Sequence, residues 1–208
     1  MNRIMEKILS LIFLSVLMTA CKEKRIPLEY CVHFSDMALY AEPKVDKSKQ
    51  LGSCKKEKPF EEYDSESIEQ GKKYNTWLNV VCSGKEGWVL SEGSYCHRDN
   101  GFIEANLNKI KLARQFNKEL DQGENYGGAS FGVMVHKDDL RAVIYLGKQY
   151  FFSNYTRIGY MQWRLTNEFG ESIVVKRVNR TIYFQVEKDP DERFRELRTE
   201  SFTAEPQL

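Results

Sequence analysis

Hydrophobic positions are spaced in four different ways along the chain. Residues 8–20 form one continuous apolar run, and residues 30–97 hold short apolar runs separated by turn residues. From residue 102 onwards the apolar positions recur first at helical spacing and then at alternate positions, the period of a half-buried strand. The pattern predicts an N-terminal leader, a β-rich first half, and a second half in which one helix precedes several strands.

The N-terminal segment has the parts of a secretory signal peptide. A short basic region with Arg3 and Lys7 precedes the apolar run, which ends in small residues just before Cys21. The run is shorter than the roughly 20 residues of a membrane-spanning helix. Cysteine directly after such a leader resembles the lipobox of bacterial lipoproteins. Met18 stands where leucine is usual, as in the relaxed spirochaete-like form of the motif.

The lipobox resemblance implies a processed and acylated protein. Residues 1–20 would be removed, and the Cys21 thiol would carry diacylglycerol, so that acyl chains such as palmitate hold the protein at a membrane. Residues 21–30 would form a charged tether. We therefore expect an exported lipoprotein of the cell envelope, at the outer membrane or the cell surface. An ordinary cleaved leader, with Cys21 incidental, is the alternative.

The first half contains short runs that are typical of strands. They cover residues 30–34, 38–40, 50–54, 77–82 and 87–90. Ser83-Gly84-Lys85-Glu86 predicts a tight hairpin turn between the last two runs. Several short strands with regular turns predict a small barrel or a sandwich, and the fold class is therefore mainly β.

Residues 31–97 resemble a bacterial SH3 (SH3b) domain. The matching segments are Ala38-Leu39-Tyr40-Ala41-Glu42-Pro43, Leu51-Gly52-Ser53-Cys54-Lys55-Lys56, Trp77-Leu78-Asn79-Val80 and Gly87-Trp88-Val89-Leu90-Ser91, closing at Tyr95. The chain departs from the family at Tyr40, where valine is usual, and at Glu57-Lys58, where glycine is common. An acidic stretch, residues 61–69, is expected to be a solvated loop. The resemblance implies a small SH3-like barrel, and members of this family often bind cell-wall peptides.

Four cysteines lie in this half, at positions 31, 54, 82 and 96, and residues 97–208 contain none. An even, clustered set in an exported chain predicts two disulfides, and the spacings are too long for paired zinc knuckles. Three connectivities are possible. The SH3b resemblance implies Cys31–Cys96, because the first and last strands of such a barrel are adjacent. It also implies Cys54–Cys82, on the expectation that these residues lie on neighbouring strands of the central meander.

The second half, residues 98–208, is predicted to be an α+β domain that begins with a helix. Asp99 and Asn100 offer capping side chains before residues 102–120, in which apolar residues recur at helical spacing. About five strands should follow as an antiparallel meander with one buried face.

A short charged helix is predicted near the C-terminus. Asp189 would be its N-cap, and Pro190 would occupy its first position, where the missing N–H costs nothing.

Composition limits the partners of the chain. Its formal net charge is only +1, whereas binding to nucleic acid needs a basic face, so we expect no nucleic-acid partner. Because the net charge is so small, we expect the acyl chains, and not a basic surface, to hold the protein at the membrane. Aromatic residues make up 12% of the chain, which suits antiparallel sheets.

No motif for catalysis is present. A papain-like peptidase needs a nucleophilic cysteine, which residues 97–208 lack, and there is no zinc-protease, serine-hydrolase or phosphate-loop motif. His136 is expected at the surface. We therefore expect a protein that is not an enzyme and binds no metal or cofactor. A carboxylate-based hydrolase that uses Glu171 or Glu187 is the enzyme alternative.

The candidate binding residues are aromatic. Tyr40, Trp77, Trp88 and Tyr95 could form a shallow groove that grips a peptide or a glycan. The interpretation that we favour for Trp77 and Trp88 is structural, as core or half-core residues of two strands, and the groove is the alternative. The leading hypothesis is a membrane-anchored, non-catalytic binding module whose partner is a peptidoglycan peptide or an envelope protein. A structural or assembly lipoprotein without a ligand is the alternative.

Overall fold

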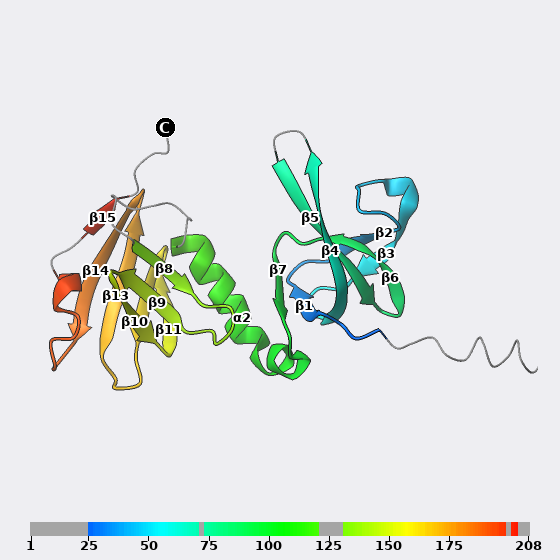
Figure 1. The fold of residues 1–208 in the computed structure, drawn as a ribbon. Helices are drawn as coiled ribbons and strands as arrows, with labels where there is room; N and C mark the ends of the chain where they lie inside the picture. The colour runs from blue at the N-terminus through cyan, green and yellow to red at the C-terminus, as the bar shows by residue number, and fades with distance from the viewer. Residues whose placement is uncertain (1–24, 71–72, 121–130, 199–200, 204–208) are drawn as a thin grey trace, which may run out of the picture.

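The computed structural model describes residues 25–70, 73–120, 131–198 and 201–203. The expected leader and Cys21 fall outside these residues. Within them the chain is mainly β, and no helix is long and apolar enough to cross a membrane. One helix lies between two β-rich halves (Figure 1).

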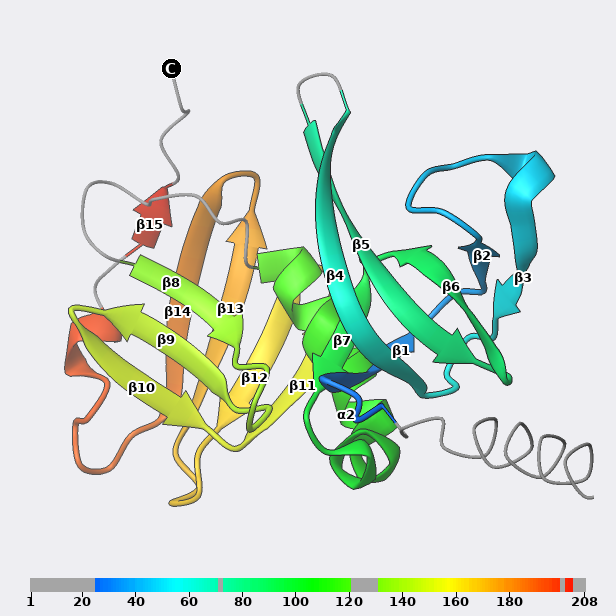
Figure 2. The same ribbon diagram turned by 45° about the vertical axis from the view of Figure 1, so that its right-hand side comes forward.

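The first half is one antiparallel sheet that curls into a half-barrel (Figure 2). Its strands are β1 (Glu29–His33), β2 (Met37–Tyr40), β3 (Gln50–Cys54), β4 (Phe60–Gln70), β5 (Lys73–Cys82), β6 (Lys85–Leu90) and β7 (Ser94–His97). They lie in the order β3-β2-β6-β5-β4-β1-β7, and a 3-10 turn, η1 (Lys47–Lys49), precedes β3. Because β1 begins at Glu29, the end of the expected tether belongs to the sheet.

Alternation along the strands fills the inside of the curl. Leu39, Leu78, Val80 and Val89 are buried there with Phe60. Their neighbours in sequence face the other side, because successive side chains of a strand point to opposite faces.

The acidic stretch is a strand, which corrects the expectation of a loop. Residues 60–70 form β4, which pairs with β5 along a long hairpin from Glu61↔Val81 to Gln70↔Lys73. The carboxylates tolerate this position because β5 supplies the backbone hydrogen bonds while one face of the hairpin stays open to water.

Both expected disulfides are present. Cys31 and Cys96 are direct partners on the adjacent strands β1 and β7, with Cα atoms 4.0 Å apart. Cys54 and Cys82 are also bonded, with Cα atoms 5.6 Å apart. However, β2 and β6 separate β3 from β5 in the sheet, so the expectation that these two strands are neighbours is wrong. The second bond therefore crosses the inside of the curl.

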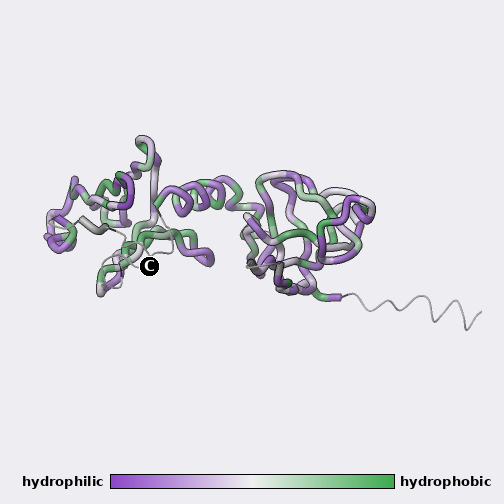
Figure 3. Tube along the Cα trace, turned by 90° about the horizontal axis from the view of Figure 1, so that it is seen from above, coloured by the Kyte–Doolittle hydropathy of each residue, from purple (hydrophilic) through white to green (hydrophobic). Residues whose placement is uncertain are grey.

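Helix α2 (Asn100–Leu120) begins where the sequence predicts, because the Asp99 carboxylate accepts a hydrogen bond of 2.8 Å from the backbone N–H of Gly101. Its buried residues are Ile103, Ile110, Ala113, Phe116 and Leu120. They share one core with strands of the second half and with Val32 and Tyr95 of the first. Viewed from above, the helix lies between the halves and carries both hydrophobic and hydrophilic residues (Figure 3).

The second half holds two antiparallel meanders, not one of about five strands. The first contains β8 (Phe131–Val135), β9 (Ala142–Leu146) and β10 (Lys148–Phe152). The second contains β11 (Asn154–Gly159), β12 (Gln162–Thr166), β13 (Ser172–Val178), β14 (Thr181–Lys188) and β15 (Ser201–Thr203). The chain changes sheet at Ser153, between β10 and β11, so the single-sheet prediction missed a break one residue long.

The expected C-terminal helix is also corrected. Asp189 and Pro190 lie in a turn, and only a 3-10 helix, η2 (Arg195–Arg198), follows. The Asp189 carboxylate accepts hydrogen bonds from the backbone N–H groups of Arg193 and Phe194, four and five residues on, and so closes a wide turn instead of capping an α-helix.

Candidate functional site

Three of the four candidate aromatic residues share one face of the curled sheet. Tyr40 is the strand partner of Trp88, which is the partner of Asn79, and Asn79 lies two residues from Trp77. Strand partners and alternate residues point to the same face of a sheet. Tyr40, Trp77 and Trp88 therefore lie on the face opposite to the one that lines the inside of the curl.

The roles of these three residues differ. Trp77 is fully buried, and its ring packs edge-on against Tyr40 with centroids 5.9 Å apart. Its indole N–H has no hydrogen-bond partner among the described residues. Tyr40 and Trp88 are half-buried. Trp77 is therefore a structural residue, and of these three only the Tyr40 and Trp88 side chains are accessible to a ligand.

Tyr95 lies elsewhere. It is buried in the core shared with α2, and its hydroxyl donates a hydrogen bond to the backbone carbonyl of Lys137 in the second half. Burial raises the pKa of this hydroxyl to about 12. Tyr95 thus joins the two halves and is not part of an aromatic groove with Tyr40.

Two adjoining pockets of about 300 and 200 Å³ lie beside this aromatic face and share Leu90 and Glu92. We call them together the Leu90 groove. One is bordered by Tyr74, Asn75, Thr76 and Ser91, and the other by His33, Met37, Ala38 and Tyr40. The groove thus has the exposed Tyr74 at one end and the half-buried Tyr40 at the other, with Leu90 shared between the two pockets.

The backbone at one end of the groove is held closely. The His33 imidazole hydrogen-bonds the carbonyl of Glu92 at 2.9 Å. Gly93 follows at φ +80°, and a Cβ there would come within 2.8 Å of the Arg114 guanidinium and 3.0 Å of the His33 ring. Only glycine fits this turn without displacing one of them.

The charge around the groove is negative. Glu92 is the acidic residue that lines it. Glu66 and Glu69 are the strand partners of Trp77 and Tyr74 on the long hairpin, and they point to opposite faces because they lie three positions apart. None of the three carboxylates pairs with a cation within the described ranges. The unpaired Glu92 carboxylate favours a ligand that carries an amine or a guanidinium.

A further pocket of about 310 Å³ lies in the second half. Tyr150 and Phe194 are its buried aromatic residues, and Phe151 and Phe169 are exposed rings at its border. Its polar residues are Arg141, Gln149, Ser153, Asn167, Glu168 and Arg193. They come from the residue before β9, from β10 and the residue after it, from the β12–β13 turn and from the turn after β14, so no local sequence motif marks this pocket.

Two arginines of this pocket are held by carboxylates and rings. Arg141 bonds Asp139 and lies over Phe151, 4.7 Å from the ring centre. Arg193 lies over Phe169 at 4.4 Å and pairs with Asp191 at 3.2 Å.

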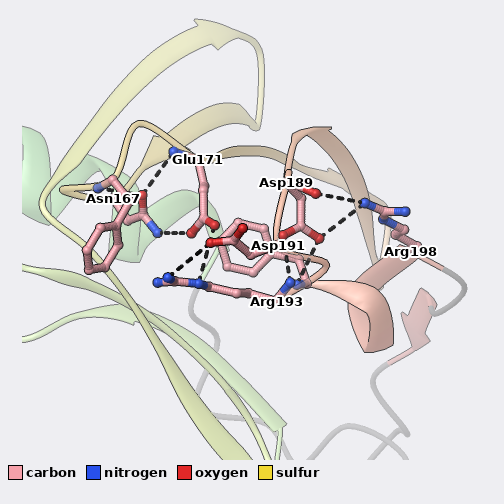
Figure 4. Close-up of polar contacts among 8 residues, drawn as sticks. Asn167, Glu171, Asp189, Asp191, Arg193 and Arg198 are labelled. Carbon is pink, nitrogen blue, oxygen red and sulfur yellow. Dashed lines mark hydrogen bonds and ion pairs between the residues drawn. The ribbon is translucent and has the colours of Figure 1, made fainter.

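Arg193 also reaches a buried carboxylate (Figure 4). Glu171 is 1% exposed, and one of its oxygens accepts a hydrogen bond of 2.5 Å from the Asn167 amide. The other lies 3.4 Å from Nε of Arg193, an ion pair without hydrogen-bond geometry. Asp189 lies beside this cluster and pairs with Arg198 at 3.2 Å (Figure 4).

The carboxylates of the enzyme alternative are not brought together. Glu171 is turned inward to Asn167 and Arg193, whereas Glu187 forms a two-pronged pair with Arg164 at 2.7 and 2.9 Å. The Arg164 guanidinium lowers the pKa of Glu187. This is the environment of a structural ion pair.

Cys31, Cys96 and Glu62 offer ligand atoms within 4.8 Å of one another. Both sulfurs are consumed by the disulfide, however, and a metal ligand requires a free thiolate. Burial, with a smaller effect from Glu29, raises the pKa of the Glu62 carboxyl, which lies 3.2 Å from the Cys31 sulfur.

Comparison of the chain with protein-family models, with curated proteins and with solved structures finds no match.

Proposed function

We propose that this chain is a membrane-anchored envelope lipoprotein whose curled sheet is a non-catalytic, SH3b-type binding module. The observation that carries the proposal is the Leu90 groove, with tyrosines at its edges and an unpaired Glu92. Its aromatic and acidic border fits a peptide that presents an amine, and a cell-wall peptide or a basic segment of an envelope protein meets that description.

Two further features support the proposal. The leader ending at Cys21 matches the pattern of acylated exported proteins. The two disulfides of the first half suit an oxidising compartment outside the cytoplasm.

The anchor is tested by the intact mass of the protein from its native membrane. We expect a chain that starts at Cys21 and carries acyl groups, with four further thiols released only by reduction. An unacylated chain would remove the anchor from the proposal.

The groove is tested by binding of the acyl-free mature protein to isolated cell wall. Trp77 is unsuitable for substitution because it is fully buried. Tyr74→Ala and Glu92→Gln remove groove groups, and Tyr160→Ala is the matched control, because Tyr74 and Tyr160 are 71% and 77% exposed. We expect saturable binding that both groove variants weaken and the control does not.

The ligand chemistry is tested by competition. A lysine-containing peptide should displace the protein from the cell wall. The same peptide with its lysine acetylated should not, because acetylation removes the positive charge. Absence of saturable binding to cell wall and to envelope proteins would favour the alternative of a structural lipoprotein without a ligand.

A further inference from the structure

The second-half pocket offers a site that is separate from the Leu90 groove. Its volume of about 310 Å³ lies at the lower end of the range for small-ligand sites. The polar groups of the pocket that have no partner determine which ligand it can bind.

Several polar groups of the pocket are already used. Asn167 holds the β12–β13 turn through both ends of its amide, and Ser153 donates to the backbone carbonyl of Thr166. Among the described residues, the Gln149 amide and the Glu168 carboxylate have no partner. These two groups supply both hydrogen-bond donors and acceptors.

The arginines keep free donors as well. Arg141 meets Asp139 through Nε and Nη2, and Arg193 meets Glu171 and Asp191 through the same two atoms. The Nη1 of each has no partner within the part of the chain that the structure describes. The pocket therefore presents N–H donors on guanidinium groups that the rings hold in place.

Charge decides the class of ligand. The acids paired with the arginines already offset both positive charges, and Glu168 adds an unpaired negative one. A ligand that carries a phosphate or a carboxylate would be repelled by the net negative charge of the pocket. A neutral molecule with many hydroxyl groups instead meets donors, acceptors and the exposed parts of the Phe151 and Phe169 side chains.

We propose that this pocket binds an uncharged saccharide. Hydroxyl groups of the sugar donate to Glu168 and to the Gln149 carbonyl, and its oxygens accept from Nη1 of the two arginines. The apolar face of the sugar ring packs against Phe169.

The test is a nuclear magnetic resonance titration of the folded acyl-free mature protein. The probes are methyl glucoside, N-acetylglucosamine and its disaccharide, with glucuronic acid as the charged comparison. We expect saturable shifts of the backbone amides of residues 149–153 and 167–170 with at least one neutral sugar. Glucuronic acid should bind more weakly.

Two variants locate the site. Phe169→Ala and Gln149→Ala should each weaken the affinity for the neutral sugar about tenfold, which is the effect of losing one important contact. Tyr160→Ala should bind as the wild type does, because Tyr160 is exposed outside the pocket. An unchanged overall spectrum of each variant shows that it is folded.

Three outcomes overturn the proposal: no saturable shift with any neutral sugar, tighter binding of glucuronic acid, or shifts that survive both pocket substitutions. None of these outcomes bears on the function proposed for the Leu90 groove, because that proposal is tested with other residues and another ligand.

Discussion

Removal of the two disulfides one at a time should destabilise the protein by different amounts. In the chain-entropy account, a cross-link stabilises by limiting the unfolded chain, and the effect grows with the length of the closed loop. The cysteines are 65 residues apart in Cys31–Cys96 and 28 apart in Cys54–Cys82. The corresponding contributions to the free energy of unfolding are about 4.3 and about 3.6 kcal/mol.

Packing does not obscure this comparison. Both bonds lie in the same hydrophobic cluster of the curled sheet, so replacing either pair by alanine leaves a comparable void. Each loss is large beside the roughly 5–15 kcal/mol that stabilises a typical domain.

The assay is equilibrium unfolding in urea, followed by circular dichroism at low protein concentration. The variants are Cys31→Ala/Cys96→Ala and Cys54→Ala/Cys82→Ala, and reduced wild-type protein is the reference for loss of both bonds. A loss below about 1 kcal/mol for either variant, or a larger loss for the shorter loop, would refute the loop-entropy reasoning.

Three further predictions test single contacts. Trp163→Phe should cost about 1–2 kcal/mol more than Trp77→Phe, because the Trp163 indole donates to Glu119 at 2.8 Å whereas that of Trp77 has no partner among the described residues. Urea unfolding of both variants gives the ranking, and the reverse order would contradict it. Glu62→Gln should match the wild type below pH 4.5 and be more stable at higher pH, because burial raises the pKa of the folded carboxyl above the 4.5 of a glutamate in water. The wild type then loses stability as pH rises through the folded pKa, by about 1.4 kcal/mol for each pH unit that separates the folded from the unfolded pKa. The urea midpoints of Glu62→Gln and of the wild type, measured below pH 4.5 and at neutral pH, test this prediction. Equal midpoints of the two proteins at neutral pH would refute it. Asp189→Ala should cost about 1–3 kcal/mol, since one buried and one partly buried backbone N–H group lose their acceptor. Hydrogen exchange should then quicken at residues 193 and 194, and unchanged exchange would argue against this role.

Local signals in the sequence were sufficient for several elements. The Asp99 cap and the helical spacing placed α2, and alternation placed strands such as β8, β12 and β14. These elements depend on contacts within a few residues or on one buried face, and the sequence displays both directly.

Features that depend on distant partners were not predicted correctly. The acidic residues of β4 became a strand because β5 supplies its hydrogen bonds, and composition carries no record of that partner. The Cys54–Cys82 pair was expected for a wrong reason, because the order of strands in a sheet is a property of the whole fold.

The candidate site shows the same division. Alternation and spacing brought Tyr40, Trp77 and Trp88 to one face, but burial removed Trp77 from any ligand's reach. Tyr95 was assigned to the groove because nothing in the sequence revealed that the predicted helix α2 would pack in one core with it. The second-half pocket was missed because its lining comes from four separate segments.

The Cys31–Cys96 bond also determines how tension passes through the molecule. A pull on the chain before Glu29 enters β1, crosses the bond to β7 and continues into α2. Residues 32–95 form a closed covalent loop beside this path and bear none of the load. A molecule held by its N-terminus therefore keeps its curled sheet unstretched while the bond is oxidised, and the contour length of that loop is released only after reduction.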